Sequence, residues 1–183
     1  HVIAREVADK LEVSPLKNSK GEKIAPVCIH HGMLAGLEKP PEWPIKELSR
    51  ETLIDIKMSK STPKSCIFVH DTPKQIKEKI KQAFCPPKEI GYNPVIDWVE
   101  TLIFWGEKRV EKGLEIKREQ EHGGNIEYTD INQLKQDFKQ GKLHPLDLKN
   151  AVADWLTKKL EPAREHFKSG KPKQGLELIK NIK

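Results

Sequence analysis

The sequence predicts a short α/β segment followed by a mostly helical segment. Over the first 88 residues, two short apolar, β-branched runs alternate with amphipathic helical patterns, which is typical of an α/β layer. From residue 89 the apolar residues recur at helical spacing, and a single ribbon pattern interrupts them. The run CPPKEIGY ends a helix between the two patterns. We therefore expect one domain at residues 1–88 and a second at residues 89–183.

The first segment is expected to alternate helices and strands along the chain. We predict helices at residues 1–11, 46–56 and 72–84, and short buried strands at residues 24–31 and 65–71. The third helix has the clearest start, because Thr72 can cap it, Pro73 suits the first helical position and Gln75 completes a capping box. Its apolar stripe lies opposite its lysines, so one face should be buried.

The second segment is expected to be helical around one β-ribbon. Asn93 should cap a helix over residues 95–105. On either side of Gly123–Gly124 the residues alternate between apolar and polar, which predicts a ribbon with one apolar face. That face would carry Leu114, Ile116, Ile126 and Tyr128. Further helices are predicted at residues 131–143, 144–170 and 171–183, and Pro162 should kink the longest of them.

The composition excludes several classes of protein. The chain has 33 basic and 27 acidic side chains and a formal net charge of +6, which fits a protein that meets an anion locally rather than through a basic tail. No apolar run approaches the roughly 20 residues needed to cross a bilayer, so we expect no membrane partner. Cys28, Cys66 and Cys85 are far apart and odd in number, which indicates free thiols in a reducing cytoplasm and predicts neither a disulfide framework nor a metal site.

The run IDIKMSKSTPKS has no helical or strand period and concentrates ammonium and hydroxyl groups. Lys57 and Lys60 lie three residues apart around Met58 and Ser59, and Ser61 follows. Two ammonium groups at this spacing in a loop can close on adjacent phosphates, while hydroxyls and backbone N–H groups add donors. The sequence has no P-loop pattern that would supply a phosphate site instead. Lysines alone would favour the plainer interpretation of a solvated surface loop.

A longer series of motifs around this loop resembles one family. KMSKS is the second signature motif of class I aminoacyl-tRNA synthetases. The runs HVIAREVA, PVCIHH, FVHDTPKQIKEKIKQAFCP, NPVIDW, GGNIEYT and GKLHPLDLKNAVADWL together resemble the C-terminal half of an archaeal-type tyrosyl-tRNA synthetase. The resemblance runs from His1 to about Phe167, and the run HPLDLKNAVA favours the tyrosine enzymes over the related tryptophanyl enzymes.

The resemblance implies a fold and a reaction. The first segment would be the end of a Rossmann-type catalytic domain with its KMSKS loop, and the second a helical anticodon-binding domain with a small β-ribbon. Family members activate tyrosine with ATP, with Mg²⁺ expected, and transfer it to tRNA(Tyr). By match, Lys57 and Lys60 are the catalytic residues that would hold the β- and γ-phosphates. Met58 would lie beside the adenine, and residues 57–61 together would bind ATP.

The resemblance also implies an anticodon-reading surface. His144 and Asp147 match the two residues of the H-P-x-D-L-K motif that contact anticodon bases in archaeal enzymes. His122 stands where the family usually has an aromatic residue that stacks on the first anticodon base, and imidazole stacks less strongly than phenyl. From the residues alone, Asp147 could equally be a favourable first-turn carboxylate, and paired His30–His31 would be local packing. Trp98, Trp105 and Trp155 are expected in the core rather than in a stacking platform.

Two alternatives to a tyrosine–tRNA ligase stay open at the level of sequence. One is a tryptophanyl-tRNA synthetase homologue, because the amino-acid pocket is not in this chain. The other is a non-catalytic tRNA-binding module, although such a binder has no need of KMSKS. The family's H-I-G-H signature, tyrosine pocket and dimer-forming insertion would lie upstream of His1. We therefore expect this chain alone to be inactive, and a homodimer only for a longer enzyme.

Overall fold

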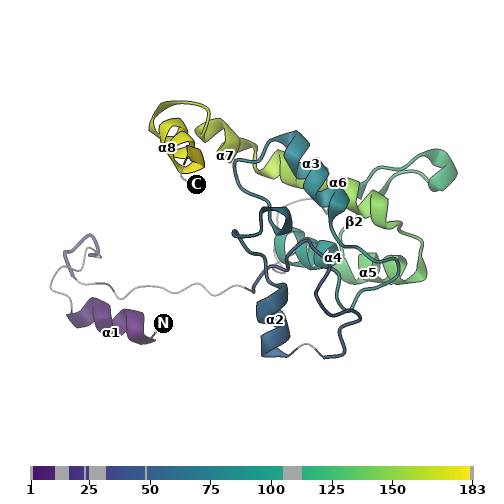
Figure 1. The fold of residues 1–183 in the computed structure, drawn as a ribbon, viewed down its shortest axis with the longest axis horizontal. Coiled ribbons are helices and arrows are strands. Elements are labelled where there is room, and N and C mark those ends of the chain that lie inside the picture. Colours follow the sequence, from purple (N-terminus) through teal and green to yellow (C-terminus); the bar gives the residue numbers. More distant parts are fainter. Residues whose placement is uncertain are drawn as a thin grey trace. The chain divides into compact units, whose positions relative to one another are not determined.

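The computed structural model describes residues 2–10, 17–22, 24, 32–47, 49–104 and 113–181 (Figure 1). The chain divides into two compact units, residues 1–32 and residues 33–183. The first unit contains α1 (Val2–Lys10), which agrees with the helix predicted there. Residues 25–31 of the predicted strand, including His30–His31, lie outside the described residues.

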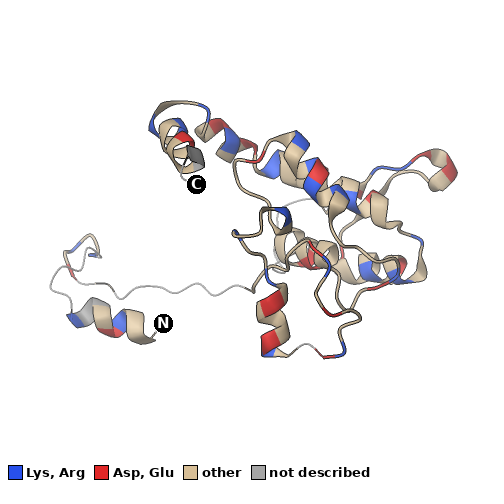
Figure 2. Ribbon diagram, in the orientation of Figure 1, with Lys and Arg blue, Asp and Glu red and all other residues tan. Residues whose placement is uncertain are grey.

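The second unit is mostly helical and contains one small sheet. Its helices are α2 (Arg50–Ile56), α3 (Pro73–Gln82), α4 (Pro94–Trp98), α5 (Ile131–Gln140), α6 (Pro145–Lys159), α7 (Glu161–His166) and α8 (Gly170–Asn181). Shorter helical turns are η1 (Pro63–Ser65), the π-helical η2 (Val99–Ile103) and η3 (Gln120–His122), and the sheet pairs β1 (Leu114–Ile116) with β2 (Ile126–Tyr128). Acidic and basic residues are interspersed along these elements (Figure 2).

The core of this unit lies where α3 packs on α6 and where α6 packs on β1. Ile76 and Ile80 of α3, Phe138 of α5 and Leu148 of α6 are fully buried in one apolar cluster. Trp98 joins them, so the prediction that it is a core residue is confirmed, and Trp155 packs partly buried against the same cluster. Trp105 lies outside the described residues. The predicted domain boundary after residue 88 stays a prediction. α3, which precedes this boundary, packs against α6, which follows it.

Local signals in the sequence correctly locate the starts of α3 and α4. The side-chain oxygen of Thr72 accepts a hydrogen bond from the Gln75 N–H, and Gln75 reaches back to the Thr72 N–H, which completes the predicted capping box. Asn93 caps α4 by accepting from the next two free N–H groups. Gly141 ends α5 with φ 79°, a left-handed conformation that glycine adopts without steric cost. These caps confirm the predicted order of helices from residue 72 onward.

The ribbon and the kink are also as predicted. β1 and β2 are antiparallel, with Leu114 opposite Tyr128 and Ile116 opposite Ile126. Gly113 precedes β1, and a Cβ atom there would lie 1.7 Å from the Tyr128 carbonyl oxygen, so the ribbon tolerates only glycine at that point. The long helical run breaks at Leu160, and Pro162 stands in the first turn of α7.

The strand predicted at residues 65–71 is wrong. The chain there leaves η1 and forms a turn, in which the Asp71 N–H donates to the Phe68 carbonyl at 2.9 Å. The Asp71 carboxylate accepts the Phe68 N–H, also at 2.9 Å. The Phe68 N–H and the Asp71 N–H, which a strand would have offered to a neighbouring strand, are thus both bonded within the turn. The chain therefore forms a turn here despite its β-branched composition.

Candidate functional site

The lysine motif begins where α2 ends, and a neighbouring segment holds its backbone. Lys57 is extended and pairs with Ala35 in an isolated antiparallel bridge. On either side of this bridge, the Gly36 N–H donates to the Ile56 carbonyl at 2.7 Å and the Met58 N–H donates to the Leu34 carbonyl at 2.8 Å. The start of the motif is therefore fixed in position, although its residues belong to no sheet.

A buried hydroxyl closes the rest of the loop. Ser65 is 5% exposed, and its Oγ accepts the Ser59 N–H at 3.3 Å. The same Oγ lies 2.8 Å from the Thr62 carbonyl and 3.0 Å from the Ser59 carbonyl, and its single proton is shared between these two acceptors. At the surface, the hydroxyls of Ser59 and Ser61 lie 2.8 Å apart. Ser65 thus fastens both ends of the turn, a role that no local pattern in the sequence indicates.

This backbone presents the two predicted lysines to solvent. The side chains of Lys57 and Lys60 are exposed, whereas Met58 is half-buried and packs against the core. Within the described part of the chain, neither lysine forms an ion pair or a hydrogen bond through its ammonium group. Both ammonium groups are therefore available to an anion, and the acidic helix α2 lies just before them (Figure 2).

A cavity of about 150 Å³ lies beside Lys57. Tyr92 and Asp97 contribute to its lining. Burial raises the pKa of the Asp97 carboxyl above its usual value, although that carboxylate accepts the Ala35 N–H at 2.9 Å. Trp98 donates from Nε1 to the Ala35 carbonyl at 2.7 Å. The same short segment that fixes the lysine motif is thus anchored to α4.

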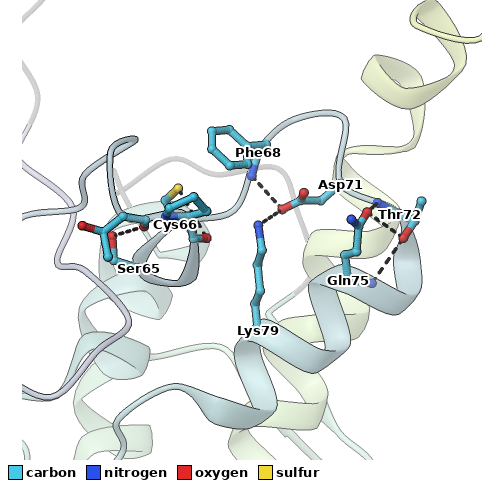
Figure 3. Close-up of polar contacts among 9 residues, drawn as sticks. Ser65, Cys66, Phe68, Asp71, Thr72, Gln75 and Lys79 are labelled. Atoms are coloured by element: carbon cyan, nitrogen blue, oxygen red, sulfur yellow. Dashed lines mark hydrogen bonds and ion pairs between the residues drawn. The ribbon is translucent and has the colours of Figure 1, made fainter. Parts of the chain in front are cut away.

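An ion pair supports the segment that follows the loop (Figure 3). Lys79 of α3 approaches the buried Asp71 carboxylate to 2.6 Å. The same ammonium lies 4.8 Å from the centre of the Phe68 ring, in a cation–π contact. Nearby, burial raises the pKa of the Cys66 thiol, so this thiol stays protonated and is a poor nucleophile. The cluster holds the turn in place and offers no reactive group.

The second predicted site begins with His122 at the turn of the ribbon. His122 ends η3 and is exposed, and its Nε2 lies 3.6 Å from Glu121 Oε1. The Glu119 carbonyl accepts both the His122 N–H and the Gly124 N–H at 3.0 Å, which closes the turn. The guanidinium of Arg118 donates to the Gly124 carbonyl and also to the Lys142 carbonyl. Sequence reasoning missed Arg118, because its partners lie on separate turns.

The other two predicted residues lie at the start of α6. His144 is the N-cap: its ring Nδ1 accepts the Leu146 N–H at 3.1 Å. Asp147 is the third residue of the helix and is half-buried, and among the described residues its carboxylate has no hydrogen-bond or ion-pair partner. No hydrogen bond, ion pair or ring contact within the described ranges joins His122 to either residue. Arg118 provides a link between the two backbones.

The described sites thus combine a fixed loop that presents two free lysines with a helical region that has a free carboxylate at a helix start. Residues 45–161 match the family described as tRNA synthetases class I (W and Y), and the chain belongs to this family.

Within this family, the chain is similar to tyrosine enzymes. The chain is 50% identical to a tyrosine–tRNA ligase of Thermococcus sibiricus and 49% identical to that of Pyrococcus furiosus, over its whole length and 48% of theirs. The solved tyrosyl-tRNA synthetase of Pyrococcus horikoshii, complexed with L-tyrosine, matches all of this chain and 48% of its own with a TM-score of 0.78 at 47% identity. That of Aeropyrum pernix matches 98% of this chain and 44% of its own with a TM-score of 0.64 at 32% identity. The chain thus spans about half the length of these relatives.

In the part of the chain that the structure describes, no helix is both long and apolar enough to cross a membrane.

Proposed function

We propose that this chain is the KMSKS and anticodon-binding half of a tyrosine–tRNA ligase, which activates tyrosine with ATP and transfers it to tRNA(Tyr). The observation that carries the proposal is the fixed loop with two unpaired lysines in a chain about 50% identical to ligases of that name. The relatives described above are tyrosine enzymes, which favours tyrosine over the tryptophanyl alternative. A cytoplasmic homodimer is proposed on the resemblance alone.

In the proposed reaction the chain's own residues act by electrostatic stabilisation. Tyrosine carboxylate attacks the α-phosphate of ATP, and negative charge grows on the departing pyrophosphate. Lys57 and Lys60 meet that charge, and the half-buried Met58 gives the adenine an apolar neighbour. The hydroxyls of Ser59 and Ser61 add donors at the same loop. Because the bonds to Ser65 already order the turn, less reorganisation is needed when the nucleotide arrives.

Mg²⁺ is expected as the partner of ATP in the proposed reaction. The described residues contain no group of three His, Cys, Asp or Glu side chains that could hold a metal ion. The Mg²⁺ would enter with the nucleotide phosphates.

The catalytic half of the proposal is tested by replacing one lysine in the full-length protein. Lys60→Ala should slow tyrosine-dependent pyrophosphate exchange by roughly a hundredfold or more, the usual scale for one oxyanion-type donor. The tyrosine KM should barely change, since the lysine meets phosphate only. Lys64→Ala is the matched control, because Lys64 is an exposed lysine of the same loop that lies outside the motif. Equal pyrophosphate-exchange rates in the two variants would contradict the proposed contact between Lys60 and the phosphates.

The RNA-binding half is tested at Asp147. A carboxylate repels phosphate yet accepts hydrogen bonds from a base edge, so Asp147→Ala should weaken binding of the tyrosine-anticodon RNA by about 1–3 kcal/mol. It should matter much less when the first anticodon base is changed. Asp154→Ala on the same helix is the control, because Asp154 already pairs with Lys77 at 2.9 Å. Equal losses for both RNAs would reduce Asp147 to a first-turn carboxylate.

A further inference from the structure

We propose that Arg118 is the positioning residue that sets the hairpin turn of the ribbon against the start of α6, and so determines how well anticodon bases are discriminated. The inference rests on the proposed function, because it concerns the same RNA-reading surface. Nothing in the sequence patterns singles out this arginine.

One guanidinium joins the two turns that carry the predicted base-reading residues. Arg118 is half-buried, and its Nε donates to the Gly124 carbonyl at 3.0 Å while its Nη1 donates to the Lys142 carbonyl at 3.1 Å. Gly124 lies two residues after His122, and Lys142 lies two residues before His144. The distance between the two backbones is thus set by a single rigid, planar group.

Two glycines allow the hairpin turn to adopt the backbone conformation in which the Gly124 carbonyl accepts the Arg118 hydrogen bond. Gly123 and Gly124 have φ values of 92° and 68°, a left-handed region that other residues rarely adopt. The backbone N–H of Arg118 also donates to Asn125 Oδ1 at 3.0 Å, which fixes the backbone from which the side chain extends, two residues after the end of β1. The guanidinium therefore approaches the Gly124 carbonyl from a defined origin.

The turn before α6 is held independently from its other side. The Lys142 N–H and the Leu143 N–H donate to the Asp137 carbonyl at 2.9 and 3.3 Å. The Asp137 carboxylate accepts the Tyr128 hydroxyl at 3.1 Å. Removing the Arg118 guanidinium should leave this turn folded, because those bonds remain. What is lost is the fixed spacing between the turn and the hairpin, which is the quantity a base-reading surface depends on.

The test compares two synthetic anticodon stem-loop RNAs, one with the tyrosine anticodon and one with its first base changed. Both are titrated with the 183-residue chain at two salt concentrations. In Arg118→Lys the charge is kept, so affinity for the changed RNA and the salt dependence should stay the same. The ratio of the two dissociation constants should fall by roughly fivefold or more, since a displaced base contact loses most of the discrimination it provides. Arg164→Lys is the control, because Arg164 also donates to a backbone carbonyl, that of Thr157.

The possible results separate a failure of the inference about Arg118 from a failure of the proposed function. If Arg118→Lys discriminates as the unmodified chain does, Arg118 contributes only charge. If it weakens both RNAs alike, the guanidinium supports RNA binding without positioning a base contact. Either result overturns the inference while the proposed function stands. If the unmodified chain does not distinguish the RNAs, the proposed anticodon role fails and the inference fails with it. Thermal melting is followed for Arg118→Lys and Arg118→Gln. If both are unfolded at the assay temperature, Arg118 is a folding residue rather than a positioning one.

Discussion

Both tyrosines of the chain should resist ionisation in the native protein, and each lies beside one of the two sites. Tyr92 is 9% exposed and lines the cavity next to Lys57, and within the described ranges its buried hydroxyl has no hydrogen-bond partner. Tyr128 is 1% exposed and donates to Asp137 at 3.1 Å. Burial raises the pKa of each phenol to about 12, and nearby carboxylates make a smaller contribution in the same direction.

The size of the effect follows from these values. At pH 11 a phenol with a pKa of about 12 is roughly one-tenth ionised, whereas an unfolded tyrosine with a pKa of about 10 is roughly nine-tenths ionised. The raised pKa means that the unfolded chain releases the proton first. Stability is therefore full below about pH 10 and falls between pH 10 and 12, by up to about 3 kcal/mol for each tyrosine.

Tyrosinate absorbance measures the ionisation directly, and circular dichroism at the same pH reports whether the protein is still folded. The native titration should stay flat through pH 10, while the same chain in urea should titrate near pH 10. Tyr128→Phe should halve the amplitude in both. A native transition centred near pH 10, with the circular dichroism unchanged, would show that the phenols are solvated and that the packing around both sites is misassigned.

Two further predictions concern the backbone around the sites. Ser65→Ala removes the hydroxyl that holds the lysine loop, so urea denaturation should show a loss of about 1–3 kcal/mol, and an unchanged stability would mean that water replaces those bonds freely. Gly113→Ala forces a Cβ atom against the Tyr128 carbonyl and should destabilise the fold by about 3 kcal/mol. Gly175→Ala, where the added atom meets nothing within 4 Å, is the control, and equal effects would contradict the close contact at β1.

Elements that depend on neighbouring residues could be predicted from the sequence. The start of α3 is one example, because Thr72, Pro73 and Gln75 act on N–H groups within one turn of helix. The ribbon is another, since alternation and a Gly-Gly turn define its apolar face. The phosphate-binding role of the lysine loop stays a prediction, which rests on the motif rather than on any periodicity.

What sequence reasoning missed depends on individual side chains that bind particular backbone groups, at separations of 3 to 24 residues. The run SCIFVHD has strand composition, but the Asp71 carboxylate accepts a nearby backbone N–H and pairs with Lys79, which turns the chain. Ser65 and Arg118 look like ordinary polar residues until the backbone brings carbonyl groups to them. Short-range patterns carry no information about such partners.

The way His144 begins α6 fixes the chemistry of its ring. Because Nδ1 accepts the Leu146 N–H, the single proton of the neutral imidazole must reside on Nε2, so the helix itself selects the tautomer. The exposed ring then presents a donor, which suits an acceptor such as a carbonyl or ring nitrogen of a base and not an amino group.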